Sequence, residues 1–302
     1  MDRSWRAGHV NCGQRFGVGP DSIYPLLGGL QPGLMVDAGA AIGMKTREML
    51  KYSPASRVVA YEPFPGNLAY LNQYAAGEPR VTVRPAALAD RHGREQLNVA
   101  QVVDFAKATH GFRLPGFSAL GELGGIKRGA VSVTVDVVRL DEEIDEPVRF
   151  LKIDVQGSER RVLEGAAGIV ARHGIDLAYV EFGGSLRVLR LLEAQGFVLF
   201  DSLFLAWPTR RYWRNWFRRE ATEMPRWNGL TRMRTTMGGR AARVWPPAPF
   251  RRFWLYAAWL MLNRIFRTGL STDLICVHRS VLERFFDLAE AAATANGQHR
   301  ET

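Results

Sequence analysis

Short apolar runs alternate with amphipathic stretches along most of the chain. Apolar and β-branched runs bounded by turn residues predict buried strands, and apolar residues recurring every three or four positions predict helices. The predicted strands are Leu34–Asp37, Arg57–Tyr61, Val81–Arg84, Gln96–Ala100, Ser132–Val138, Val148–Asp154, Asp176–Glu181, Gly196–Leu203 and Asp273–His278. The predicted helices are Asp21–Leu30, Met44–Tyr52, Pro65–Ala75, Glu159–Ala171, Leu186–Gln195 and Val281–Ala293.

This order predicts an α/β fold with a doubly wound, mostly parallel sheet, because strands joined through helices by short connections pair in parallel. The last two strands are joined by residues 207–270 and not by an ordinary crossover helix, so we expect an antiparallel last strand. The expected organisation is a lead-in (1–33), a main domain (34–206 and 271–293), an insert (207–270) and a tail (294–302).

The insert carries the charge of the protein. The 302-residue chain has a formal net charge of +10, yet residues 207–270 hold 14 arginines against two acidic residues, a net charge of +12. They also hold seven of the eight tryptophans and a predicted helix, Phe250–Phe266, that is apolar on nearly every side. The apolar run Phe253–Leu262 is too short to span a bilayer.

Three interpretations of this basic, aromatic insert stay open. It forms a helical cap that packs on the core with its arginines in solvent, or it binds an anionic membrane surface or a lipid-linked substrate. Binding of single-stranded nucleic acid is the third interpretation, although no recognised nucleic-acid-binding module accompanies the insert.

The first predicted strand ends in a tight turn, Asp37–Gly43, whose glycines are Gly39 and Gly43. The dinucleotide fingerprint needs a different glycine spacing, and the carboxylate of Asp37 would repel a pyrophosphate. The next strand is followed by Glu62, which is placed to accept both hydroxyls of a ribose. The pair predicts an adenosine site for a cofactor with an amine and a sulfonium, S-adenosylmethionine (SAM).

Carboxylates stand at the ends of four predicted strands: Asp37, Glu62, Asp154 and Glu181. Ligands of such folds bind outside the carboxyl ends of the strands, so we expect all four to line one crevice. The alternative is that one or two of them only cap helices. Glu159 opens the helix that follows Asp154, where the helix dipole favours an acid.

The run Leu151–Ala166 (L-K-I-D-V-Q-G-S-E-R-R-V-L-E-G-A) resembles the signature of FkbM-type SAM-dependent methyltransferases. The other similar stretches are Val36–Gly43, Tyr61–Asn67, Ala86–Asp90, Ser118–Leu120 and Val138–Glu142. The resemblance covers residues 34–205 and returns at 273–279. It implies a class I methyltransferase (Rossmann-like) fold, SAM as methyl donor, and O-methylation of a sugar or polyketide hydroxyl.

The resemblance also implies cofactor-binding residues. Glu62 would hold the ribose of SAM, and Asp90 would lie near the adenine. The residues that would face the methionine part are Asp37, Gly39, Ala41 and Gly43.

A hydroxyl acceptor needs a group that removes its proton as the methyl arrives. We expect Asp154 to be this base, or to orient the hydroxyl, with Glu159 and Glu181 as second candidates. Asp154 with Glu181 would alternatively suit a divalent cation, and metal dependence stays open. His110 becomes a candidate base if its loop covers the site.

Two residues depart from the family pattern. The usual Gly-Ala-Asn turn here ends in Ala41, and the usual Val-Glu-Gly here contains Gln156. These departures keep open a non-catalytic protein of the same fold that binds through its insert. An RNA methyltransferase is a further alternative, although the amine-methylation signature Asn/Asp-Pro-Pro-aromatic is missing after the fourth main strand.

The expected location is the cytoplasm, with peripheral attachment to the inner face of the membrane where a glycan or glycolipid precursor would be methylated. Cys12 and Cys276 form neither a disulfide framework nor a metal pattern, which fits a reducing compartment. We expect no signal peptide and no transmembrane helix.

Overall fold

The computed structural model describes residues 20–99, 118–120, 131–182, 185–201, 272–282 and 284–285. The chain separates into two compact units, one of residues 32–175 and one of residues 1–31 with 176–302. The predicted insert and its helix Phe250–Phe266 lie outside the described residues, as do His110 and Cys12.

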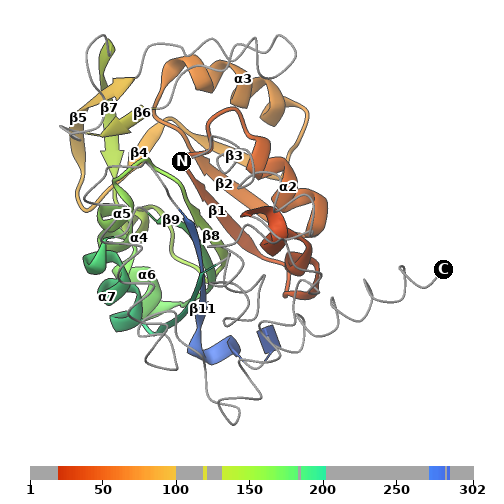
Figure 1. The fold of residues 1–302 in the computed structure, drawn as a ribbon. Helices are drawn as coiled ribbons and strands as arrows, with labels where there is room; N and C mark the ends of the chain where they lie inside the picture. Colours follow the sequence, from red (N-terminus) through yellow and green to blue (C-terminus); the bar gives the residue numbers. More distant parts are fainter. Residues whose placement is uncertain are drawn as a thin grey trace, which may run out of the picture. The chain divides into compact units, whose positions relative to one another are not determined.

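The unit of residues 32–175 is built on four parallel strands in the order β8-β1-β2-β3. These strands are β1 (Leu34–Ala38), β2 (Arg57–Tyr61), β3 (Val81–Arg84) and β8 (Val148–Ile153). Every residue of β1 is buried, because β1 lies between β2 and β8 and helices cover both faces of these strands (Figure 1). Its position places the residues after β1 between those that follow β2 and β8.

Helices connect and cover these strands. The helices of this unit are α2 (Met44–Tyr52), α3 (Pro65–Ala76), α4 (Leu140–Glu143), α5 (Glu159–Gly165) and α6 (Ala167–Arg172). Figure 1 shows α2 and α3 on one side of the parallel strands and α4, α5 and α6 on the other. The strands thus have helices on both faces, as a doubly wound fold requires.

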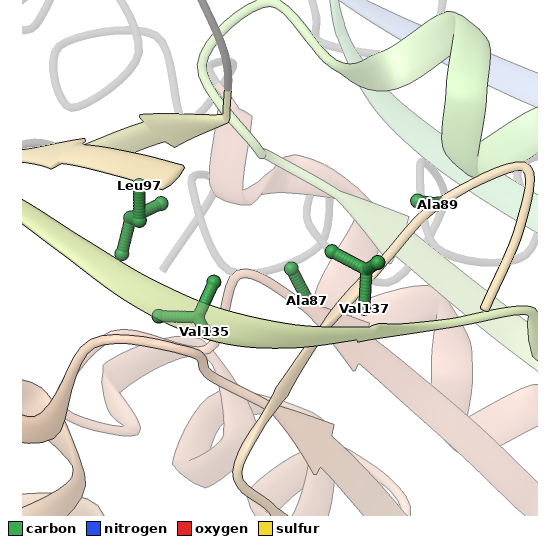
Figure 2. Close-up of a cluster of buried hydrophobic side chains, with 5 residues drawn as sticks. All are labelled: Ala87, Ala89, Leu97, Val135 and Val137. Atoms are coloured by element: carbon green, nitrogen blue, oxygen red, sulfur yellow. The ribbon is translucent and has the colours of Figure 1, made fainter. Parts of the chain in front are cut away.

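A second, smaller sheet in the same unit has the strand order β4-β7-β5-β6. Its strands are β4 (Ala86–Leu88), β5 (Gly93–Val99), β6 (Ser118–Leu120) and β7 (Val131–Val138). Strand β7 runs parallel to β4 and antiparallel to β5. Figure 2 shows a cluster of small apolar side chains beside β7, comprising Ala87, Ala89, Leu97, Val135 and Val137. Phe64, at the start of α3, packs against this cluster.

The other unit contains three antiparallel strands. β11 (Thr272–His278) pairs antiparallel with both β9 (Ile175–Phe182), of which all but Ile175 belongs to this unit, and β10 (Phe197–Asp201). The unit also contains helix α7 (Leu186–Ala194) and the 3₁₀ helices η1 (Pro20–Gly29) and η3 (Arg279–Val281). Its strands bury Leu177, Val198 and Ile275.

The predicted fold class is confirmed, since parallel strands alternate with helices and the last strand is antiparallel. Three details were wrong. The helix predicted over Glu159–Ala171 is two helices that meet at Ala166, and Asp21–Leu30 is a 3₁₀ helix that begins at Pro20. Gln96–Ala100 and Ser132–Val138 belong to the small sheet and not to the main one.

Candidate functional site

The carboxyl ends of β1, β2 and β8 lie next to one another. Ala38, the last residue of β1, is level with Tyr61 of β2 and with Ile153 of β8. The amides of Gly39 and Ala40 both donate to the carbonyl of Tyr61, at 3.0 Å each. The amide of Asp154 donates to the carbonyl of Ala38 at 3.1 Å. The three segments that follow these strands therefore form one connected edge.

The turn after β1 has left-handed backbone at alternate residues. The φ angles are 76° at Gly39, 50° at Ala41 and 85° at Gly43. A Cβ on Gly39 would lie 2.1 Å from the carbonyl oxygen of Asp154, so only glycine lets the turn approach β8 this closely.

Glu62 ties this turn to the end of β2. The carboxylate is 3% exposed, and its two oxygens accept from the amides of Ala41 and Phe64 at 2.8 Å each. Burial raises the pKa of Glu62, and the hydrogen bonds from Phe64, Ala41 and the Asn67 side chain partly oppose this rise. A carboxylate offers about four lone pairs, and the Ala41 amide, the Phe64 amide and the Asn67 side chain use three of them, so Glu62 keeps capacity for one more donor.

Asn67, in the first turn of α3, stands beside Glu62. Its side chain is 5% exposed and hydrogen-bonds Glu62, while its Oδ1 has no partner among the described residues. A buried acceptor without a donor costs about 1–3 kcal/mol, so such an atom calls for a ligand group. The ribose of SAM presents two hydroxyl donors. The Glu62 carboxylate and Asn67 Oδ1 offer matching acceptors, so these residues fit the cofactor.

A buried ion pair lies beneath the turn. Lys152 of β8 donates to Asp37 Oδ1 and to the carbonyl of Gly39, both at 2.9 Å, and Thr46 donates to Asp37 Oδ2 at 2.7 Å. Burial alone would lower the pKa of Lys152, but the carboxylates of Asp37 and Asp154 outweigh it and raise the pKa. Asp37 is 0% exposed, so its geometry suits positioning of the turn better than direct contact with a ligand.

Asp154 is the accessible carboxylate of this edge. Its side chain is 41% exposed, against 0% for Asp37. Oδ1 accepts from Gln156 Nε2 at 2.9 Å, and Oδ2 lies 3.8 Å from the Lys152 ammonium. An accessible carboxylate held from both oxygens is suited to accept a proton from an incoming hydroxyl.

Glu159, the first residue of α5, turns back to the loop that precedes it. It is 8% exposed and accepts from the amide of Gly157 at 2.7 Å. Burial raises its pKa, the loop amides lower it, and the nearby charge of Asp154 raises it further. Its carboxylate thus fixes the shape of the loop that carries Asp154.

Asp90 lies in an ion-pair network. Arg161 of α5 donates to Asp90 at 2.6 Å and binds both carboxylate oxygens of Glu95. Arg139 donates to the carbonyl of Asp90 at 2.7 Å. The hydrogen bond and charge of Arg161 outweigh desolvation and lower the pKa of Asp90. Asp90 is therefore held in a fixed orientation next to Ala89 of the small cluster in Figure 2.

One carboxylate candidate remains, and two histidines have partners of their own. Glu181 lies on β9, in the other unit, so its place in the crevice stays a prediction. His173 pairs with Asp145 at 2.8 Å, and His278 bonds Ser280 at 2.7 Å. Within the described part of the chain, no group of three or more His, Cys, Asp or Glu side chains is arranged to hold a metal ion.

Lys152, Asn67 and Arg161 received no role in the sequence analysis. Lys152 is the fifth residue of an apolar strand, and its partner Asp37 is 115 positions away. The sequence did contain one signal of this ion pair, the positive charge of Lys152 in a mostly apolar strand. A lysine in a buried strand needs a buried partner.

The chain matches a known family in sequence. The sequence model of the methyltransferase FkbM domain matches residues 37–199, more than half of the chain. The curated proteins contain no match.

Several solved structures have a similar arrangement. The FkbM methyltransferase of Methylobacillus flagellatus KT has 21% sequence identity and a TM-score of 0.40, with 57% of this chain and 41% of that chain covered. The SAM-dependent O-methyltransferase of Thermotoga maritima has 13% identity and a TM-score of 0.34, with coverages of 61% and 53%. The fibrillarin of Aeropyrum pernix, solved with natively bound SAM, has 15% identity and a TM-score of 0.33, with 60% of this chain and 66% of that chain covered.

The matched part of this chain spans less than half the length of the Methylobacillus protein. All three TM-scores are below 0.5, so the family assignment rests on the sequence match across residues 37–199.

Proposed function

The chain belongs to the FkbM methyltransferase family, and we propose that it transfers the methyl group of SAM to a hydroxyl, specifically of a sugar in a glycan or glycolipid precursor. The observation that carries the proposal is the accessible carboxylate of Asp154 at the end of β8. A hydroxyl is a poor nucleophile until it loses its proton, so a carboxylate at this position supports an oxygen acceptor.

The cofactor would be held by the edge that β1 and β2 share. Glu62 and Asn67 offer acceptors for the ribose hydroxyls, and the turn Gly39–Gly43 brings backbone close to the ligand. Asp90 and Phe64 would border the adenine, next to the apolar cluster of the small sheet. SAM, when bound, would supply an electrophilic methyl group. The sulfur that carries this group leaves as a neutral thioether, so it needs no help from an acid.

On the acceptor side, Asp154 would take the hydroxyl proton. The Lys152 ammonium, 3.8 Å from Oδ2, stabilises negative charge at this carboxylate by electrostatic attraction. Asp37 and the carbonyl of Gly39 hold Lys152 in place. One buried lysine thereby sets the distance between the cofactor turn and the proposed base.

The contacts of the other two candidate bases differ. The carboxylate of Glu159 bonds the amide of its own loop, which supports a positioning role. Glu181 remains a second candidate base.

The described helices include none with both the length and the apolar character needed to cross a membrane. Contact with a membrane surface through residues 207–270 stays part of the proposal, and it would bring the enzyme to a lipid-linked acceptor.

Methyl transfer from radiolabelled SAM tests the proposed reaction. The acceptors are methyl glycosides of common hexoses, a lipid-linked oligosaccharide fraction and total RNA. We expect label in the glycan acceptors, in ether linkages that survive mild base, because methyl ethers resist hydrolysis and methyl esters do not. Label confined to RNA would contradict the sugar proposal, and SAM binding without transfer to any acceptor would favour the non-catalytic alternative.

Asp154→Asn tests the base. We expect kcat to fall about 10²–10⁴-fold, the usual contribution of a placed general base, while the affinity for SAM stays within about threefold. Asp136→Asn is the matched control, because Asp136 lies on β7 with its side chain 66% exposed and paired to Arg94. Wild-type turnover in Asp154→Asn would remove Asp154 from this role.

A further inference from the structure

We propose that Gln156 is a positioning residue for the acceptor side of the site, whose side-chain amide holds the carboxylate of Asp154 in its reactive orientation. The inference rests on the proposed function, since it assigns Asp154 to the acceptor. It goes beyond that function because it names a residue at which this chain departs from the family pattern, and it gives the departure a purpose.

Two groups hold the Asp154 carboxylate from opposite oxygens. Gln156 Nε2 donates to Oδ1 at 2.9 Å, and the Lys152 ammonium lies 3.8 Å from Oδ2. Lys152 is buried and fixed by Asp37, whereas Gln156 is half-buried in the loop after β8. Gln156, the less buried of the two residues, therefore makes the shorter contact with Asp154.

Gln156 makes this contact from a strained backbone conformation. Its φ is 54°, a left-handed conformation that costs a non-glycine residue about 1–2 kcal/mol. Glycine would adopt the same conformation freely, and the next residue, Gly157, does so with φ 105°. Strain of this kind persists where the surrounding structure enforces it and the side chain is useful.

The loop supplies the enforcement. Glu159 accepts from the amide of Gly157 at 2.7 Å, and Ser158 is 3% exposed. These contacts lock the residues that follow Gln156. The side chain of Gln156 is thus presented to Asp154 by a preformed loop, as pre-organised positioning requires.

The side-chain amide of Gln156 donates a hydrogen bond to Asp154, which an ionised carboxylate at position 156 could not do. The Nε2 group is a donor and stabilises the ionised form of Asp154, whereas glutamate would place a second acceptor there. Two charged groups act on Asp154 as well, the ammonium of Lys152 and the carboxylate of Glu159. Removal of the Gln156 donor therefore takes away a hydrogen bond that favours the ionised form of Asp154.

Gln156→Gly separates the proposed role from a structural one. Glycine relieves the backbone strain and deletes the amide, so we expect the melting temperature to rise by about 2–4 °C while kcat falls about tenfold. The affinity for SAM should stay within about twofold. Gln156→Asn tolerates the left-handed backbone and keeps an amide, so it should retain more of the turnover than glycine does.

A titration of carboxyl ¹³C resonances gives a readout that needs no acceptor. The Asp154 signal is assigned by its loss in Asp154→Asn, and its midpoint should move to higher pH in Gln156→Gly because the ionised form loses a donor. Gln96→Ala is the control, because Gln96 lies exposed on β5 and bonds Thr134 and Ser132 of the small sheet.

An unchanged Asp154 midpoint, or a kcat within twofold of wild type in Gln156→Gly, would overturn the inference. Absence of transfer to every acceptor in the wild-type protein would count against the proposed function instead. The titration decides the role of Gln156 in either case.

Discussion

Two residues of the described chain hold left-handed backbone without being glycine, Ala41 and Gln156, and each lies at the end of a central strand. Ala41 is exposed, and its amide donates to Glu62 at 2.8 Å, so the backbone of the turn and not the methyl group serves the site. Strain on both sides of one edge is a residue-scale mark of function, because folding alone would favour glycine or asparagine there.

Ala41→Gly should stabilise the protein by about 1 kcal/mol, since it removes the left-handed penalty without loss of a buried side chain. The midpoint of urea unfolding measures this gain. Ala40→Gly is the matched control and should lower the midpoint, because Ala40 is 4% exposed and has no left-handed backbone to relieve. A lower midpoint for Ala41→Gly would mean that the turn is not strained.

Glu159→Gln should alter how stability depends on pH. Burial raises the folded-state pKa of Glu159 above the ordinary 4.5, so its contribution is fully present below 4.5 and is lost as pH rises through the folded pKa. Glutamine does not titrate. The stability of the variant relative to wild type should therefore improve as pH rises from 4.5 into the neutral range, measured by urea unfolding at a series of pH values. A constant difference would show that the pKa of Glu159 is not raised.

At the scale of elements, the small sheet and α5 are joined by a glycine contact. A Cβ on Gly165, the last residue of α5, would lie 1.9 Å from the carbonyl oxygen of Ala89, just after β4. The glycine directly precedes Ala166, where the helix predicted across Glu159–Ala171 is interrupted. The contact holds Arg161 of α5 close to Asp90, which is bonded at 2.6 Å.

Gly165→Ala should destabilise the protein by about 2–3 kcal/mol, because a backbone atom cannot yield to the added methyl group as a side chain would. The control is Gly77→Ala at the end of α3, where the nearest atom to a new Cβ is Tyr74 O at an ordinary 3.7 Å. Equal unfolding midpoints for the two variants would show that α5 and β4 move apart at little cost.

Most long elements could be predicted from the sequence. Strands such as Arg57–Tyr61 and helices such as Met44–Tyr52 have the predicted bounds, because their apolar periodicity is clear and turn residues flank them. β4, β6 and α4 were missed, since three or four residues show no period. The alternation in Val131–Val138 predicted a strand but not its partner, because period two states which face is buried and not which strand lies beside it.

The sequence predicted which residues of the candidate site lie at strand ends, but not the side-chain contacts among them. The closeness of Glu62 to Ala41 and of Asp154 to β1 follows from the fold class, because the carboxyl ends of parallel strands meet at one edge of the sheet. The partners of Lys152 and Asn67 could not be predicted in this way, since they depend on side-chain orientation across long sequence separations.

At the scale of the whole molecule, the unit of residues 32–175 provides the candidate site, and the uneven distribution of charge along the chain bears on which ligands reach it. The net charge of +12 in residues 207–270 contrasts with a near-neutral remainder. An anionic surface or substrate would be drawn to the basic segment by long-range attraction that falls with ionic strength. If residues 207–270 bring the enzyme to a lipid-linked acceptor, turnover on that acceptor depends on this attraction and SAM binding does not. We therefore expect added salt to lower turnover on a lipid-linked acceptor more than it lowers the affinity for SAM.

Calorimetric titration of the protein with SAM tests the central claim most directly. We expect saturable binding of one SAM per chain, with the affinity about 10–100-fold lower in Glu62→Ala, because hydrogen bonds to a charged group contribute about 1.5–3 kcal/mol. Glu146→Ala, whose side chain is 44% exposed, should bind as the wild type does. No saturable binding by the folded wild-type protein, or equal affinity in a folded Glu62→Ala variant, would contradict a SAM site at the ends of β1 and β2.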